Sequence, residues 1–72
     1  MENTMRVIID VIWDCGGPTK SGTVRVDGYR MDFVVHNGQL ILSDPDASEI
    51  CIRSVAEALK GLGVNVFKTE KA

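Results

Sequence analysis

The sequence predicts an α+β two-layer sandwich with the element order ββββαβ, in which one helix packs on one face of a mainly antiparallel sheet. The dipeptides Asp27-Gly28 and Asn37-Gly38 divide an alternating apolar run between residues 22 and 43. Such dipeptides favour type I′ hairpin turns, which need positive φ at both central residues. After Asp44-Pro45 the apolar spacing changes to that of an amphipathic helix.

The 72 residues predict a single small α+β domain spanning residues 1–72, with an ordered core from about residue 5 to residue 67. The apolar content of 44% and the charged content of 25% are those of an ordinary folded domain. A chain of this length buries only about 60% of the surface that its unfolded form exposes. A partner or a second copy can therefore add to its stability.

Residues 5–13 alternate strictly and predict a long first strand. One side of this strand is wholly apolar and is expected to face the core: Met5, Val7, Ile9, Val11 and Trp13. The other side is expected to face outward: Arg6, Ile8, Asp10, Ile12 and Asp14. The polar, glycine-rich residues 14–21 then predict a loop that closes a wide hairpin.

The two turns predict strands at 22–26, 29–36 and 39–43 and also fix their register. Residues that face each other on the core side are then Val26 and Tyr29, Val24 and Met31, Gly22 and Phe33, Val35 and Leu40, and Phe33 and Leu42. The opposite side of the same strands is mostly polar. The two turns therefore agree on which side of the sheet is buried.

Asp44 is expected to cap a helix that begins at Pro45, because Asp is a favoured N-cap and proline fits the first helical position. The helix is expected to end at Gly61 and Gly63. Its apolar face comprises Ala47, Ile50, Cys51, Ser54, Val55, Ala58, Leu59 and Leu62, with Ile52 at the boundary. Residues 64–67 predict a fifth strand, placed antiparallel beside the first in the sheet order 4-3-2-1-5, and residues from 68 onward a polar tail.

Charge and composition argue against several classes of partner. The net charge of −2 and the pI of about 5.1 give no basic patch for nucleic acid. Residues 5–13 include charges and form no long apolar run, so neither a signal peptide nor a membrane partner is expected, and the cytoplasm is the expected compartment. Cys15 and Cys51 are expected to be reduced thiols, with Cys51 buried in the helix face.

No cofactor or metal is expected. The segment Gly16-Gly17-Pro18-Thr19-Lys20-Ser21 has some features of a phosphate-binding loop, but Thr19 replaces the glycine needed before the lysine, and a strand follows instead of a helix. Cys-x-x-Cys and His-x-x-x-His spacings are missing from the sequence. The acidic residues 44, 46 and 49 are explained by the start of the helix.

An enzyme remains the alternative. Cys15 is expected at the edge of an exposed loop, and His36 is the only histidine that can activate its thiol. A small thiol-dependent enzyme or small-molecule-binding protein would need these two side chains to be adjacent, with an orienting group and an oxyanion hole. A histidine exposed at the end of a hairpin strand is the simpler interpretation.

The outer side of the predicted sheet suggests a function. Ile8, Ile12, Val34 and Ile41 are expected there, with Arg25, Arg30 and His36 among the polar residues around them. An apolar centre with an arginine-rich rim is typical of a protein-binding patch, although scattered surface aliphatics are also common. The expected function is a non-enzymatic protein-interaction module that docks on a macromolecular partner or on a second copy. Small acidic domains of this kind include regulators and inhibitors from phages and mobile elements, an analogy of size and charge.

Overall fold

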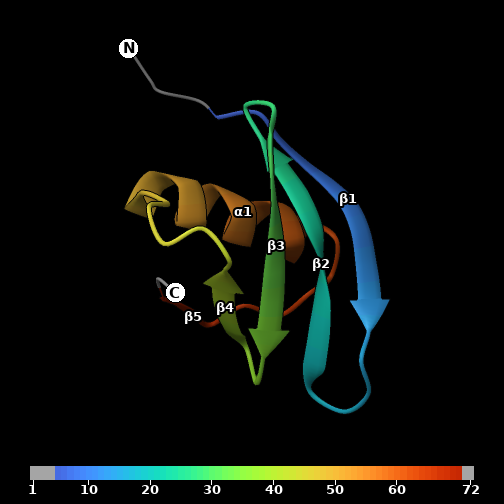
Figure 1. Cartoon of the computed structure of the whole chain (residues 1–72). Helices are drawn as coiled ribbons and strands as arrows, with labels where there is room; N and C mark the ends of the chain where they lie inside the picture. The colour runs from blue at the N-terminus through green and yellow to red at the C-terminus, as the bar shows by residue number, and fades with distance from the viewer. Residues whose placement is uncertain (1–4, 71–72) are drawn as a thin grey trace.

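The computed structural model describes residues 5–70 and confirms the predicted α+β class. A helix packs against one face of a five-stranded sheet (Figure 1). The elements in chain order are β1 (Val7–Asp14), β2 (Thr19–Val26), β3 (Tyr29–His36), β4 (Gln39–Leu42), α1 (Glu49–Gly61) and β5 (Lys68–Glu70). The predicted frayed end at residues 1–4 and the last two residues of the predicted polar tail, 71–72, lie outside the described residues, whereas residues 68–70 of that tail form β5.

The predicted meander of β2, β3 and β4 is confirmed, including its register, but β2 begins at Thr19 instead of residue 22, so the predicted loop at residues 14–21 is reduced to residues 15–18. Asp27 and Gly28 have φ values of 50° and 90°, and Asn37 and Gly38 have 51° and 80°, as type I′ turns require. All five predicted core-side pairs are present. The alternation buries Val24, Met31, Phe33, Val35, Leu40 and Leu42 against the helix.

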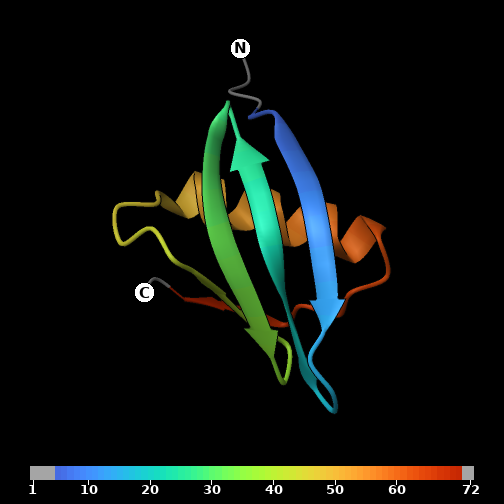
Figure 2. The same cartoon turned by 45° about the vertical axis from the view of Figure 1, so that its right-hand side comes forward.

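The predicted position of the fifth strand is wrong. β5 lies parallel to β4, so the sheet order is β1-β2-β3-β4-β5 instead of 4-3-2-1-5. Helix α1 crosses the sheet towards β1, and the chain then returns across the same face to β4 (Figure 2). Val64 and Val66 are buried along this return, so their alternation marks a segment packed on the core. The strand begins after it, where the Phe67 and Lys68 amides donate to the Gly38 carbonyl.

The predicted start of the helix is also wrong. Asp44 forms a turn, in which its Oδ1 accepts from the Asp46 amide at 2.9 Å and its carbonyl accepts from the Ala47 amide. Aspartate readily bonds the backbone two residues on, and this turn competes with helix capping. Ser48 caps the helix instead, with its Oγ accepting from the Cys51 amide at 3.1 Å.

The buried face of the helix also differs from the predicted face. Cys51, Val55 and Leu59 are buried as predicted, but the stripe is completed by Ile52 and Ala56. Two residues predicted on the core face are exposed on α1 or just after it, namely Ile50 at 46% and Leu62 at 60%. The helix therefore presents two short side chains, two β-branched ones and Leu59 to the sheet.

A β-bulge in β1 overturns the strict alternation predicted for that strand. Ile9 pairs with Val24 and Val11 pairs with Thr23, so Asp10 has no partner residue. The extra residue reverses the side that each later residue faces. Ile12, predicted on the outer side, packs against the core, whereas the predicted core residues Val11 and Trp13 are 38% and 54% exposed.

Gly22 explains why the strands accommodate the bulge. Gly22 pairs with Ile12 on one side and with Phe33 on the other. A Cβ at this position would collide with the Val11 carbonyl oxygen and would lie 2.9 Å from two carbons of the Phe33 ring. Because glycine has no Cβ, the bulged backbone and the ring can both approach β2 closely.

Candidate functional site

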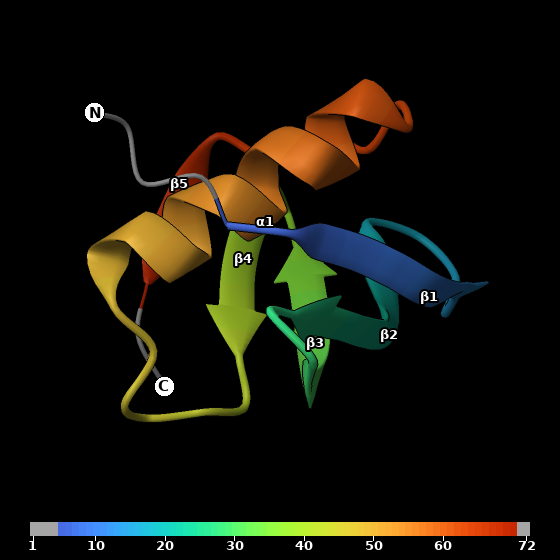
Figure 3. The ribbon, with the colours of Figure 1, turned by 90° about the horizontal axis from the view of Figure 1, so that it is seen from above.

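The candidate site is the side of the sheet that faces away from α1, which we call the outer face. Figure 3 shows the helix on one side of strands β1–β4 and the outer face on the other. Five apolar side chains from three strands lie on this face: Ile8, Val11, Trp13, Val34 and Ile41. A sheet face in contact with water normally alternates to polar residues more completely.

Four of the outer-face residues form a line across the sheet, which we call the apolar row. Trp13 pairs with Ser21, Ser21 with Val34, and Val34 with Ile41. The row thus spans β1 to β4, with one small hydroxyl between its large apolar members. Trp13 is the only tryptophan in the chain and, at 54% exposure, leaves much of its indole ring in contact with water.

An arginine–aspartate pair borders the apolar residues at one end of the outer face. The Arg25 Nε donates to Asp10 Oδ2 at 3.0 Å, and its Nη2 donates to Asp10 Oδ1 at 2.9 Å. This hydrogen-bonded guanidinium lowers the pKa of the Asp10 carboxyl, helped by the charge of Arg30, and Asp10 raises the pKa of Arg25. The bulge therefore places Asp10 where it can hold Arg25 in one orientation.

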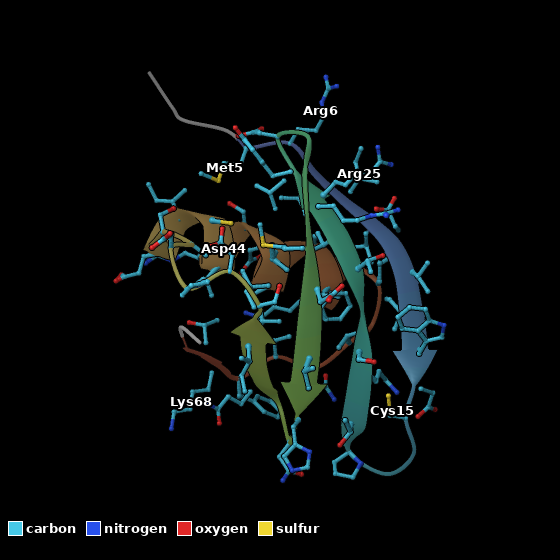
Figure 4. All side chains as sticks on the ribbon, in the orientation of Figure 1. Met5, Arg6, Cys15, Arg25, Asp44 and Lys68 are labelled. Carbon is cyan, nitrogen blue, oxygen red and sulfur yellow. The ribbon has the colours of Figure 1, made fainter. Side chains whose placement is uncertain are left out.

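Cys15 lies at the other end of the sheet from Arg25 (Figure 4). Its Sγ is 3.2 Å from the Ser21 Oγ. The His36 ring contacts Thr19 Oγ1 through Nδ1 at 2.6 Å and Asn37 Nδ2 through Nε2 at 3.2 Å. The thiol and the imidazole thus contact different hydroxyl groups of β2. Among the described residues 5–70 there is no direct hydrogen bond between Cys15 and His36, as the thiol-dependent enzyme would need.

The other thiol has a different environment. Cys51 is buried at 6% exposure, as predicted, and burial raises the pKa of its thiol, with the charges of Asp44 and Asp27 adding to the effect. A buried thiol with a raised pKa behaves as a small apolar side chain. Cys15 is exposed, so the two cysteines are free and lie in separate surroundings.

Six of the seven residues predicted for the interaction surface lie on the outer face: Ile8, Arg25, Arg30, Val34, His36 and Ile41. Ile12 does not, because the bulge turns it to the core. Sequence reasoning missed Val11 and Trp13. The signal that points to them is Gly22, because a glycine inside a strand often marks a bulge or a close backbone approach.

Two shallow hollows lie elsewhere. One of about 370 Å³ is lined by the β1–β2 loop, the Asn37-Gly38 turn and the Gly63–Phe67 segment. Another of about 280 Å³ lies between Met5, Tyr29 and the turn that precedes α1. In residues 5–70, no three side chains of His, Cys, Asp or Glu are grouped so as to hold a metal ion. The helix in this range is too short and too polar to cross a bilayer.

Comparisons with protein-family models, with curated proteins and with solved structures found no match. The function is therefore argued from the residues of the outer face.

Proposed function

We propose that this protein is a small non-enzymatic interaction module that docks its outer face on another folded protein. The observation that carries the proposal is the exposed Trp13 side chain in one row with Val34 and Ile41. Tryptophan and arginine are enriched where protein interfaces are strongest, and the centre of an interface is more apolar than its rim. The partner surface that fits is apolar opposite the row and polar around it.

The arrangement of these residues favours a binding surface over scattered exposure. Single exposed aliphatic residues are common on protein surfaces. Here the apolar row crosses four strands, and Ile8 and Val11 extend it along β1. The hydrogen-bonded Asp10–Arg25 pair stands beside this extension. Such a domain acts by covering its partner's surface, which suits a regulator or an inhibitor.

The test replaces Ile41 with lysine, because a charge at this end of the apolar row disfavours burial of the row. Ile50→Lys is the matched control, since Ile50 is an exposed aliphatic residue of α1, away from the sheet. We expect both variants to fold, with melting temperatures near that of the wild type. Ile41→Lys should no longer retain the partner in a pull-down, and Ile50→Lys should retain it.

The single tryptophan provides a second measurement. Docking of the outer face should shift Trp13 emission to shorter wavelength and protect it from acrylamide, because the ring leaves water. Unchanged partner retention by Ile41→Lys would contradict the proposal. Unfolding of Ile41→Lys would mean that this side chain is needed in the core, and Val34→Glu would then replace it as the test variant.

A further inference from the structure

We infer that the occupant of the outer face is a second copy of this chain, in a dimer whose two-fold axis runs along the apolar row. The inference rests on the proposed function and names its partner. An isologous contact needs a surface that is complementary to itself. The register of strands β1–β4 supplies such a surface.

An axis along the row places each of its residues against the same residue of the partner. Trp13, Val34 and Ile41 then each meet their own copy, so apolar side chains cover one another. Residues two positions before the row meet residues two positions after it, because the partner's strands run in the opposite direction. This rule gives the further pairs within strands β1–β4.

The pairs so formed are chemically matched. On β3, Asp32 and His36 flank Val34, so Asp32 lies opposite the partner's His36, and the pair occurs twice. On β2, Thr23 lies opposite the partner's Thr19, and next to β4 Ser43 lies opposite the partner's Gln39. These pairs join hydrogen-bond donors to acceptors. Within strands β1–β4, no pair brings like charges together.

The other simple axis fails this criterion. A two-fold axis parallel to the strands, between β2 and β3, places each residue opposite its neighbour in the register. Arg25 pairs with Arg30 in the sheet, so this axis would stack Arg25 on the partner's Arg30. Like charges facing each other across an interface are unfavourable. Within strands β1–β4, the charges therefore favour the axis along the row over the axis parallel to the strands.

The face also has a suitable size and charge. Strands β1, β2 and β3 have eight residues each and β4 has four. With about 4.8 Å between strands and about 3.3 Å per residue they give a flat footprint of roughly 440 Å², which side chains enlarge. A standard interface buries about 800 Å² per partner, or about one-sixth of the 4736 Å² exposed by this chain. Within strands β1–β4 the outer face carries Asp10, Arg25, Arg30 and Asp32, whose charges cancel, so two copies meet without net repulsion.

The first test is the mass of the full chain by light scattering over a range of concentrations, with Trp13 emission recorded in parallel. We expect a monomer–dimer equilibrium, with Trp13 protected in the dimer. Ile41→Lys should weaken the dimer by at least about tenfold, because it sets a lysine on the two-fold axis against the partner's lysine. Ile50→Lys should leave the dissociation constant unchanged.

The second test is a charge exchange that depends on the axis. Asp32→Arg should weaken the dimer, since it places an arginine against the partner's His36, and His36→Glu should weaken it by placing a glutamate against the partner's Asp32. The double variant should recover most of the lost affinity, because the new arginine and glutamate face each other across the interface. Additive losses in the double variant would overturn the axis.

A monomer at every concentration, with Trp13 open to acrylamide, would overturn the second copy as the occupant. The proposed function would still stand in that case if Ile41→Lys, but not Ile50→Lys, lost a different protein partner. A dimer that Ile41→Lys and Val34→Glu leave intact would also overturn this inference, because self-association would then use another surface. The pull-down with Ile41→Lys and Ile50→Lys would still decide the proposed function.

Discussion

Gly22→Ala is the substitution that tests the bulge most directly. In most strands this change is favourable, since glycine is less stable than alanine in a strand by about 0.5–1 kcal/mol. Here the added methyl group would collide with the Val11 carbonyl oxygen and crowd the Phe33 ring at 2.9 Å. The carbonyl belongs to the sheet backbone and cannot rotate away. Overpacking of a core costs about 1–3 kcal/mol of stability. We expect a cost near the upper end of this range, because the contact is with backbone, which cannot change rotamer.

We therefore expect Gly22→Ala to lower the free energy of unfolding by about 2–3 kcal/mol, out of the roughly 4–11 kcal/mol typical of a chain of 72 residues. For a domain of this size each kcal/mol shifts the melting temperature by about 4–8 °C, so the expected loss is on the order of 10–20 °C. The assay is thermal unfolding followed by circular dichroism, with urea unfolding as a second measure.

Gly61→Ala is the matched control for this experiment. Gly61 is the last residue of α1, and a Cβ there would have no atom within 4 Å. This variant should be as stable as the wild type or more stable by up to about 1 kcal/mol, because alanine is the better helix former. A melting temperature of Gly22→Ala equal to that of the wild type would refute the close approach of β1 and β2. The outward placement of Val11 and Trp13 would then lose its structural basis.

Four further predictions follow from the structure. Ile12→Lys should destabilise the fold by about 2 kcal/mol and Val11→Lys by less than about 0.5 kcal/mol. If thermal unfolding gave the reverse order, the result would support a regular β1 strand without the bulge. Cys51→Ser should cost about 1–2 kcal/mol, because it buries a hydroxyl without an assured partner, and a thiol reagent should modify Cys15 in the native protein well before Cys51. Asp10→Asn should lower the melting temperature at neutral pH, because the stabilisation by Arg25 needs the Asp10 carboxylate. The difference in melting temperature between wild type and variant should disappear as the pH falls below 3.8, the ordinary pKa of the carboxyl, and then through its lowered pKa in the folded protein. Cys15→Ala and His36→Ala should each leave the fold intact, and loss of an enzymatic activity in both folded variants would favour the thiol-dependent enzyme.

The meander was predictable because local chemistry determines it. Asp-Gly and Asn-Gly are among the few dipeptides that readily adopt positive φ at both positions, and a two-residue turn leaves a single register. From that register the burial of Phe33 and Leu40 and the outward position of Val34 and Ile41 follow by alternation. Five residues of the candidate site could be placed in this way, and Ile8 followed from the alternation of β1 before the bulge.

The helix start and the fifth strand depend on competition between alternatives that the sequence allows equally. Asp44 can cap a helix or form a turn, and Ser48 can cap the same helix four residues later. Val64 and Val66 can alternate in a strand or on a segment that packs against the core. The choice follows from where α1 meets the sheet and from the Gly38 carbonyl, which accepts two amides from the returning chain. These are tertiary contacts, which cannot be predicted from local propensity.

The bulge has the largest consequence for function, because one extra residue changes the character of the outer face. Without it, the outward side of β1 would carry Ile8, Asp10, Ile12 and Asp14, and the apolar row would end in a charge or an aliphatic side chain. With it, Trp13 enters the row opposite Ser21, and Asp10 stays on the same side to bind Arg25. The bulged strand can approach β2 only because Gly22 has no side chain. A regular β1 strand beside a β-branched residue at position 22 would be expected to give a more stable sheet. The bulge, the strand glycine and the exposed tryptophan therefore belong together, because the bulge turns Trp13 outward and Gly22 makes room for the bulge.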